Sequence, residues 1–235
     1  MLDIATHKDI LLEILRDIYS DETIGPFLGF KGGTAAYLFY GLDRFSVDLD
    51  FDLLDAGKKE YVFGRMKEIM QKYGDVKDAR IKRFNLFFLL SYRNKQKDAQ
   101  NIKIEINHRG FDSRYEVKLY MGIPMKVAIQ EDMFACKLVA MYDRLGRTNR
   151  DIYDVWFFKK NMWPINKEIV EKKSKMTYGV LLEKAIAKLD KFNNKNILDG
   201  LGELLNNKQK DWVRVNLLKE VIFYLELMAE KSNNT

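Results

Sequence analysis

Residues 31–52 read KGGTAAYLFYGLDRFSVDLDFD, and the rest of the chain is organised around this stretch. Its first part places Gly32, Gly33 and the hydroxyl of Thr34 directly before an apolar helical run. A glycine turn that opens a helix presents backbone N–H groups at the positive end of that helix, which favours a bound phosphate. The second part alternates aspartate with apolar residues, a pattern typical of a strand with one acidic face. Together they predict a phosphate-binding turn followed by a carboxylate-bearing strand.

The acidic strand carries Asp48, Asp50 and Asp52 on one face. Such a row of carboxylates repels itself unless cations or basic side chains neutralise it. A calcium-binding EF-hand loop also opens with D-x-D-x-D, but here its sixth position is Leu53 and its twelfth is Lys59, where glycine and glutamate are needed. The solvated outer face of an edge strand is the other interpretation that the pattern allows.

A third carboxylate favours a metal site over a solvated face. Residues 101–108 alternate isoleucine with polar residues and place Lys103 and Glu105 on one face. If this strand lies beside the acidic strand, Glu105 converges with Asp48 and Asp50. Three convergent carboxylates can hold two Mg²⁺ ions, or Mn²⁺ in their place, for phosphoryl-transfer chemistry. Lys103 can contact a phosphate or neutralise the acids, and the sequence leaves both roles open.

The glycine turn differs from two common nucleotide-binding motifs. A Walker P-loop needs a lysine after its last glycine, whereas Lys31 precedes the glycine pair, and the turn is not G-x-G-x-x-G either. The segment between Thr34 and Asp48 is long enough for one short helix and a turn back into the next strand. This spacing predicts that the turn lies close to the carboxylates.

This combination resembles the DNA polymerase β-like nucleotidyltransferase superfamily, whose signature is a G-[GS]-[ST] turn, a helix, DxD on a strand and a later acidic strand. More narrowly, it is similar to the AbiEii/AbiGii-type toxin nucleotidyltransferases, whose first block continues as R-x-S-x-DLDF and whose second block is a lysine-bearing helix followed by RD-x-x-D. The resemblance covers residues 28–160. The matching positions are Arg44, Ser46, Asp48, Leu49, Asp50 and Phe51 in the first block, and Lys137, Arg147, Arg150, Asp151 and Asp154 in the second.

The resemblance implies a metal-dependent enzyme that moves a nucleoside monophosphate from an NTP to an acceptor, which in some members is tRNA, and thereby blocks growth or aborts phage infection. It implies that Asp48 and Asp50 bind both metals, while Glu105 binds the catalytic metal and helps to deprotonate the acceptor. An antitoxin from the same operon is the implied partner, and we expect a monomer. The residues expected to contact the nucleotide are Gly32, Gly33, Thr34, Arg44, Ser46, Lys103, Lys137, Arg147 and Arg150.

Two rival functions fit the same motifs. One is a nucleotidyltransferase that modifies a small molecule, such as an antibiotic, and the R-x-S-x-DLDF detail favours the toxin-like function over it. The other is a catalytically silent nucleotide-binding protein of the same fold, which the intact Asp48, Asp50 and Glu105 argue against. Asp151 and Asp154 are expected to pair with the neighbouring arginines rather than bind metal.

The hydrophobic patterns predict an α+β protein in two domains. Residues 1–125 form the polymerase β-like domain, a mixed sheet flanked by helices, and residues 126–235 form a helical bundle, with Pro124 at the seam. The first helix is predicted to be capped by Thr6. Strands are predicted at 27–30, 45–53, 78–83, 85–93, 101–108 and 116–121, and helices at 6–20, 34–41, 58–73, 131–145, 149–160, 167–174, 177–191, 195–206 and 210–231.

Composition sets the remaining expectations. The net charge of +6 over 235 residues is compatible with a polyanionic partner such as RNA. Cys136 is the single cysteine, which excludes an intrachain disulfide and favours the reducing cytoplasm. The apolar runs are too short to span a bilayer, so no membrane partner is expected. We interpret Cys136, Phe84, Phe87 and Phe88 as core residues. Neither His7 nor His108 is expected to act as a catalyst.

Overall fold

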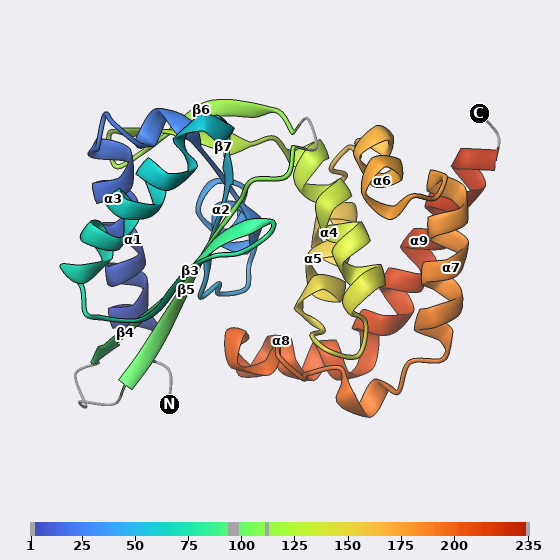
Figure 1. The fold of residues 1–235 in the computed structure, drawn as a ribbon. Coiled ribbons are helices and arrows are strands. Elements are labelled where there is room, and N and C mark those ends of the chain that lie inside the picture. Colours follow the sequence, from blue (N-terminus) through green and yellow to red (C-terminus); the bar gives the residue numbers. More distant parts are fainter. Residues whose placement is uncertain (1–2, 94–98, 111–112, 234–235) are drawn as a thin grey trace. The chain divides into compact units, whose positions relative to one another are not determined.

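The computed structural model describes residues 3–93, 99–110 and 113–233. These residues divide into two compact units (Figure 1). The first unit contains the described residues up to Gly110 together with Arg114–Ala128, and the second contains Ser113 and the described residues from Ile129 onward. None of the described helices is long and apolar enough to cross a membrane.

The first unit is built on a mixed sheet with the strand order β3-β4-β5-β2-β1-β7-β6, seven strands among the described residues. Two neighbouring pairs, β2 with β5 and β1 with β7, are parallel, and the other pairs are antiparallel. This arrangement confirms the predicted α+β class with a mixed sheet. The strands are β1 Leu28–Lys31, β2 Leu49–Leu53, β3 Asp75–Ile81, β4 Asn85–Arg93, β5 Ala99–Asn107, β6 Tyr115–Tyr120 and β7 Ile123–Ala128.

One face of this sheet is covered by helices. The helices of the unit are α1 Ile4–Ser20, α2 Gly32–Phe39 and α3 Lys59–Gln71, with 3₁₀ turns at Gly25–Phe27 and Ala56–Lys58. In β4, Phe88 stacks on Phe63 of α3 with 5.1 Å between ring centroids, and it is paired in register with Ile104 of β5. Phe88 and Ile104 are both fully buried. Because side chains alternate along a strand, Glu105 lies on the opposite face of the sheet from α3.

Two predictions about this unit are wrong at element ends. The cap of α1 is Asp3 rather than Thr6, because the Asp3 carboxylate accepts hydrogen bonds from both the backbone N–H and the hydroxyl of Thr6. The acidic strand begins at Leu49 rather than Phe45. The carbonyl of Phe45 accepts a hydrogen bond from the Arg44 side chain, and the carbonyl of Asp48 accepts one from Thr34. Both carbonyls are therefore bonded to side chains in the segment where the strand was predicted to begin.

The end of the sheet also differs from the prediction. Met121 and Gly122 have φ of 49° and 82° and turn the chain tightly, after which β7 returns along β6. Pro124 therefore lies inside a strand, paired with Leu119, and does not end the sheet. Proline is accepted at the second residue of β7 because a strand end tolerates the loss of one N–H donor. The sheet runs to Ala128, past the predicted seam, and the division into two domains at residue 125 stays a prediction.

The exposure of the aromatic residues in and beside β4 corrects another prediction. Phe84 is 43% exposed and Phe87 is half-buried, so of the three phenylalanines only Phe88 belongs to the core. The continuous apolar run around them suggested a strand buried on both faces, whereas here α3 covers one face and Asn85, Phe87 and Leu89 on the other face are half-buried. Cys136 is likewise half-buried rather than core.

The second unit is helical, as predicted for the C-terminal half. Its elements are α4 Gln130–Arg144, α5 Arg150–Lys160, α6 Lys167–Ser174, α7 Tyr178–Asp190, α8 Asn207–Trp212, a π-helical segment Val213–Leu217 and α9 Leu218–Asn233. The helix predicted at 195–206 is wrong: two 3₁₀ turns, Asn194–Asn196 and Gly202–Leu204, flank Gly200, whose φ of 67° is incompatible with a continuous helix. The predicted apolar face of the last helix is buried at Val213, Leu217, Val221, Leu225 and Met228.

Candidate functional site

The glycine turn joins β1 to α2, and close contacts explain both glycines. Gly32 has a φ of +82°, and a Cβ there would lie 2.5 Å from Oδ2 of Asp50. A Cβ at Gly33 would lie 2.8 Å from Oγ of Ser46. Lys31, at the N-cap position of α2, makes no side-chain capping bond to the helix. The missing side chains therefore let a carboxylate of β2 approach the N-terminus of α2.

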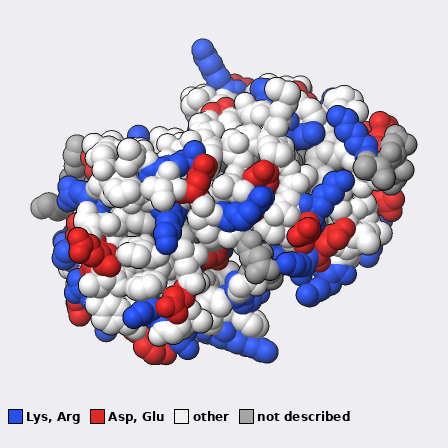
Figure 2. Space-filling model, turned by 90° about the horizontal axis from the view of Figure 1, so that it is seen from above, with Lys and Arg blue, Asp and Glu red and all other residues white. Residues whose placement is uncertain are grey.

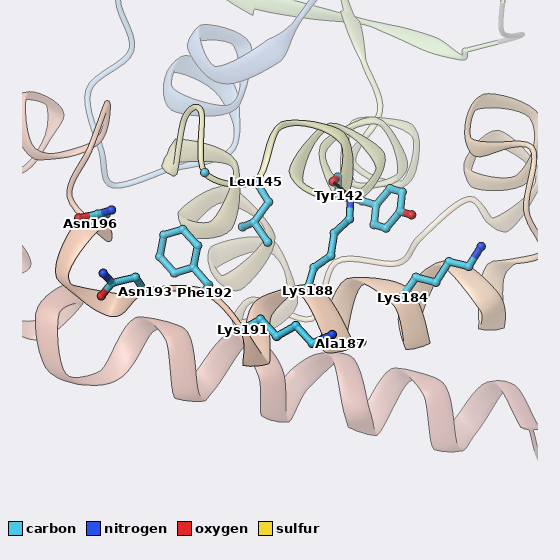
Figure 3. Close-up of a pocket in the computed structure, with 10 residues that line it drawn as sticks. Tyr142, Leu145, Lys184, Ala187, Lys188, Lys191, Phe192, Asn193 and Asn196 are labelled. Carbon is cyan, nitrogen blue, oxygen red and sulfur yellow. Dashed lines mark hydrogen bonds between the residues drawn. The ribbon is translucent and has the colours of Figure 1, made fainter.

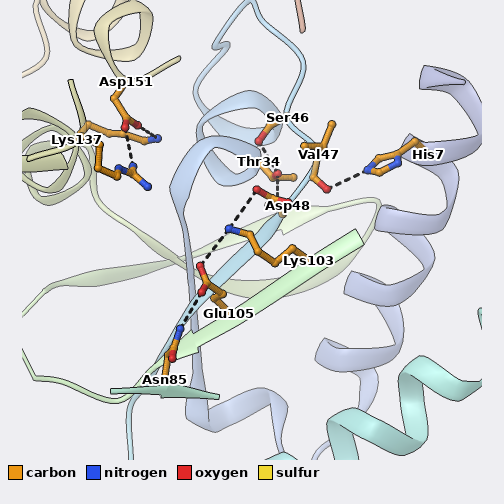
Figure 4. Close-up of polar contacts among 11 residues, drawn as sticks. His7, Thr34, Ser46, Val47, Asp48, Asn85, Lys103, Glu105, Lys137 and Asp151 are labelled. Carbon is orange, nitrogen blue, oxygen red and sulfur yellow. Dashed lines mark hydrogen bonds and ion pairs between the residues drawn. The ribbon is translucent and has the colours of Figure 1, made fainter. Parts of the chain in front are cut away.

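Three of the residues expected to contact the nucleotide lie behind this turn. Thr34, Arg44 and Ser46 are 2%, 1% and 5% exposed. The Thr34 hydroxyl donates to the carbonyl of Asp48 and lies 2.9 Å from Oγ of Ser46, as Figure 4 shows. Arg44 Nη1 donates to the carbonyl of Phe45 at 2.8 Å. Thr34 ties α2 to the segment that leads into β2, and Arg44 bonds within that segment, so these buried side chains support the turn from behind.

The acidic residues come together around Lys103. The parallel pairing of β2 and β5 sets Asp50 opposite Glu105 in register. Lys103 Nζ lies 3.5 Å from Oδ2 of Asp48 and 3.2 Å from Oε2 of Glu105 (Figure 4). Burial lowers the pKa of Lys103, but the charges of Asp48, Asp50 and Glu105 outweigh it and hold that pKa above its ordinary value. Asp48, Asp50 and Glu105 thus share the field of one ammonium group.

The donor set of this cluster suits a hard divalent cation. Carboxylate oxygens are the ligands that Mg²⁺ and Mn²⁺ prefer in proteins. Within the described ranges, no group of three or more His, Cys, Asp or Glu side chains is arranged closely enough to hold a metal ion. The carboxylates of Asp48 and Glu105 contact the Lys103 ammonium instead, which supplies the positive charge that a metal would supply. The residue types therefore suit a metal ion, but the carboxylates are arranged around the ammonium group of Lys103.

Asp52 has a different role from its neighbours on β2. Its Oδ1 accepts hydrogen bonds from Lys31 and, at 2.9 Å, from Asn107 Nδ2, and its Oδ2 accepts one from the Tyr115 hydroxyl. These donors come from β1, β5 and β6. Because both oxygens are engaged by side chains, Asp52 braces the sheet beside the cluster.

Two further residues support the cluster, and sequence reasoning did not assign them. Asn85 donates from Nδ2 to Oε1 of Glu105 at 2.8 Å and so orients that carboxylate. His7 is 1% exposed, with Nε2 3.0 Å from the carbonyl of Val47 and Nδ1 2.6 Å from the Tyr92 hydroxyl. Burial lowers the pKa of His7, against the opposing effects of the Val47 carbonyl and the Asp48 charge. A neutral His7 therefore anchors the segment just before Asp48, and no local pattern could have revealed this long-range contact.

The second block of predicted residues lies in the helical unit. Lys137 Nζ lies 2.9 Å from Oδ1 of Asp151 and 2.7 Å from Oδ2 of Asp154, and Arg144 Nη2 lies 2.7 Å from Oδ2 of Asp151. Both aspartates are fully buried, which makes this an ion network between α4 and α5. The expected pairing of an aspartate with a neighbouring arginine holds for Asp151 and Arg144.

The other two arginines of that block follow α4, one on the connection to α5 and one at the start of α5. Arg147 is exposed and donates from Nη2 to the carbonyl of Asp143 at 2.7 Å, while Arg150 is the first residue of α5. Arg147, Arg150 and Lys137 belong to the helical unit, and Asp48, Asp50 and Glu105 to the sheet unit. A role for these three basic residues in nucleotide binding stays a prediction.

The helical unit also carries a basic hollow. It has a volume of about 550 Å³, and none of its lining residues is acidic. Lys184, Lys188 and Lys191 of α7 and the following turn border it (Figure 3). Lys188 Nζ donates to the carbonyl of Tyr142 at 3.0 Å and lies 3.8 Å from the centroid of the Tyr142 ring. Lysines beside an aromatic ring form a surface suited to an anion.

The mixed sheet, the glycine turn and the acidic cluster together define a nucleotidyltransferase. The family described as "Nucleotidyl transferase AbiEii toxin, Type IV TA system" matches residues 13–215. The chain belongs to this family, which confirms the resemblance noted from the sequence. No curated protein matches the chain.

Several solved structures share the fold. One, described as a "putative nucleotidyltransferase" from Helicobacter pylori, has a TM-score of 0.65 at 24% identity and covers 100% of this chain and 98% of its own. A second H. pylori protein, JHP933, has a TM-score of 0.57 at 22% identity, with the same coverage. The nucleotidyltransferase toxin MenT4 from Mycobacterium tuberculosis has a TM-score of 0.56 at 19% identity and covers 98% of this chain and 85% of its own.

Proposed function

We propose that this nucleotidyltransferase moves a nucleoside monophosphate from an NTP to an acceptor hydroxyl, with Asp48, Asp50 and Glu105 at the reacting centre. The observation that carries the proposal is the parallel register of β2 and β5. It sets Asp50 opposite Glu105, while Gly32 lets the Asp50 carboxylate lie against the N-terminus of α2. A phosphate-binding helix end and a group of carboxylates on adjacent strands are the two parts that a bound NTP requires.

Asp48, Asp50 and Glu105 are the residues that would hold Mg²⁺, with Mn²⁺ as a substitute. When bound, two such ions neutralise the triphosphate and lower the pKa of the attacking hydroxyl. With the carboxylates engaged in this way, the Lys103 ammonium would be available to contact a phosphate. This proposal joins the two roles that the sequence left open for Lys103, neutralising the acids first and binding phosphate later.

Different residues of the chain have different roles in the reaction. N–H groups at the start of α2 bind the triphosphate, and the buried Thr34, Arg44 and Ser46 hold those groups in place. The acceptor oxygen attacks the α-phosphorus, the bond from that phosphorus to the bridging oxygen breaks, and pyrophosphate leaves with the electron pair. Glu105, oriented by Asn85, accepts the proton of the hydroxyl.

The proposed acceptor is RNA, in particular tRNA, and the proposed setting is a toxin of a type IV toxin–antitoxin system acting in the cytoplasm. The net charge of +6 and the lysine-lined hollow support this acceptor, and the family name supports the toxin setting. An antitoxin from the same operon is the proposed partner of a monomeric chain. A small-molecule acceptor remains the alternative, because the same centre can serve it.

One experiment separates these acceptors. The protein is incubated with Mg²⁺, total cellular RNA and each of the four α-labelled NTPs, and a parallel set contains aminoglycosides in place of RNA. We expect label in a tRNA-sized band with one NTP. Label only in the small-molecule fraction would favour the alternative, and no label in any fraction would overturn the proposed activity. Growth arrest on expression of wild-type protein, but not of Asp50→Asn, would support the toxin setting.

Gly32→Ala is expected to reduce the transfer rate at least about tenfold and to destabilise the sheet unit by about 1–3 kcal/mol. The added Cβ meets the Asp50 carboxylate, and alanine is strained at this positive φ. Steady-state transfer and chemical unfolding measure the two effects. Gly64→Ala in α3 is the matched control, because a Cβ there meets no atom within 4 Å and alanine favours a helix. Equal activity in the two variants would show that the turn does not position Asp50.

Lys103→Met is expected to lower the Mg²⁺ concentration needed for half-maximal thermal stabilisation by about tenfold, since about 1.4 kcal/mol of competition from the ammonium is removed. In metal-free buffer the same variant should melt below wild type, because Asp48 and Glu105 lose their counter-ion. Melting curves at a series of Mg²⁺ concentrations measure both. Lys77→Met, an exposed lysine on β3, should change neither. An unchanged Mg²⁺ response would place the metal elsewhere.

A further inference from the structure

An aromatic and cationic patch lies at one end of strands β3, β4 and β5, and the reacting centre described above does not use it. Phe84 sits in the turn between β3 and β4 and is 43% exposed. The guanidinium carbons of Arg83 and Arg109 each lie 4.8 Å from its ring centroid. Lys82 Nζ lies 3.5 Å from the centroid of the half-buried Phe87. We call these five residues the aromatic platform.

The platform is placed next to Glu105 by the sheet. Phe87 of β4 is paired in register with Glu105 of β5, so the two side chains share a face. Asn85 lies two residues before Phe87 and binds Glu105 directly. The backbone N–H of His108 donates to the carbonyl of Phe84 at 3.0 Å, which fixes the turn against the end of β5.

The strand order separates the platform from the glycine turn. Along the sheet, the platform begins on β4, Glu105 lies on β5, Asp50 on β2 and the glycine turn follows β1. A triphosphate on α2 therefore lies on one side of the carboxylates and the platform on the other. In-line attack on the α-phosphorus requires the acceptor to approach from the side opposite the leaving pyrophosphate. With the triphosphate bound at α2 as proposed above, the platform would lie on that side of the carboxylates.

We propose that the aromatic platform binds an unpaired nucleobase of a single-stranded RNA acceptor, next to the nucleotide whose hydroxyl reacts at Glu105. An exposed aromatic ring stacks on a base, and guanidinium planes do the same while their charge attracts the adjoining phosphates. Arg83, Lys82 and Arg109 supply three positive charges within the platform, which matches a polyanion and not a neutral or cationic small molecule. This subsite rests on the proposed transfer to RNA and names the part of the RNA that is recognised.

Binding of a fluorescein-labelled single-stranded RNA, measured by anisotropy without NTP, tests the subsite separately from the transfer activity. Phe84→Ala is expected to weaken binding about tenfold, the loss typical of one stacked base, and to leave NTP affinity unchanged. Tyr61→Ala is the matched control, because Tyr61 is 48% exposed on α3, which covers the other face of the sheet. A blunt duplex of the same sequence should bind wild type and Phe84→Ala equally.

Two additional variants guard against a folding artefact. Phe84→Leu keeps an apolar side chain and should also weaken single-strand binding, while its circular dichroism and melting stay as in wild type. Arg109→Gln should reduce the slope of log affinity against log salt by about 0.7, as expected for one lost phosphate contact on a single strand. Wild-type affinity in both Phe84 variants, or an equal loss in Tyr61→Ala, would overturn the platform. Weakened binding without any NMP transfer would instead leave the platform standing and remove the proposed activity.

Discussion

Asp50→Asn is expected to lower the rate of nucleotidyl transfer by about a thousandfold while the protein stays folded. The change keeps the size of the side chain but removes a negative charge that faces Glu105 across the β2–β5 pair. Charge stabilisation of this kind at a reacting centre is worth about 3–4 kcal/mol, which corresponds to the expected loss. Lys103 still contacts Asp48 and Glu105 in this variant, so these two carboxylates keep their counter-ion and the protein stays folded. Initial rates with the α-labelled NTP that gives label in the acceptor assay measure the effect.

Asp52→Asn is the matched control for this prediction. It makes the same chemical change on the same strand, but the Asp52 carboxylate is engaged by Lys31, Tyr115 and Asn107. We expect a lower melting temperature and a rate within about tenfold of wild type, because a bracing residue acts through the sheet rather than on the substrate. Comparable rates in wild type and Asp50→Asn would remove Asp50 from the centre. Equal losses in both aspartate variants would make the effect structural.

Lys137→Met is expected to destabilise the helical unit by about 3–5 kcal/mol. Asp151 and Asp154 are fully buried, and removing their shared ammonium leaves carboxylates without adequate compensation in a low-dielectric interior. All three tryptophans, Trp156, Trp163 and Trp212, lie in this unit, so denaturant unfolding followed by tryptophan fluorescence reports on it specifically.

The same experiment distinguishes the two roles of Lys137. Lys184→Met, an exposed lysine on α7, should change the free energy of unfolding by less than about 0.5 kcal/mol. If Lys137 serves the nucleotide instead, its substitution by methionine will leave stability near wild type and weaken NTP affinity. A loss of stability with unchanged NTP affinity assigns Lys137 to the α4–α5 ion network alone.

Short-range patterns were sufficient for much of the fold. The alternation around Glu105 predicted β5 to within two residues, and the apolar run from Asn85 to Arg93 predicted β4 at its observed ends. Prediction failed where a single residue outweighed the pattern. Pro124 suggested the end of the sheet although a tight turn at Met121 allowed one more strand, and Gly200 interrupted a helix whose periodicity was otherwise adequate.

Side-chain environment was harder to predict than secondary structure. An apolar run such as that around Phe87 and Phe88 has the same sequence pattern whether the strand is covered on one face or on both. The tertiary structure leaves Phe87 half-buried opposite Glu105 and Phe84 exposed in the preceding turn, and both belong to the aromatic platform. Likewise, Thr34, Arg44 and Ser46 have residue types suited to a nucleotide, but they lie buried behind the glycine turn.

The sequence by itself determined the chemical groups of this protein: two glycines before a helix, an alternating row of aspartates and a later glutamate on a strand of the same period. These follow from local rules, because a turn needs a particular φ and a strand alternates its faces whatever surrounds it. Only the tertiary structure decided which groups meet. The parallel register of β2 with β5 joins Asp50 to Glu105 across more than fifty residues of chain and gives Lys103 its acidic partners. Long-range pairing depends on the packing of the whole core, and no local pattern encodes it.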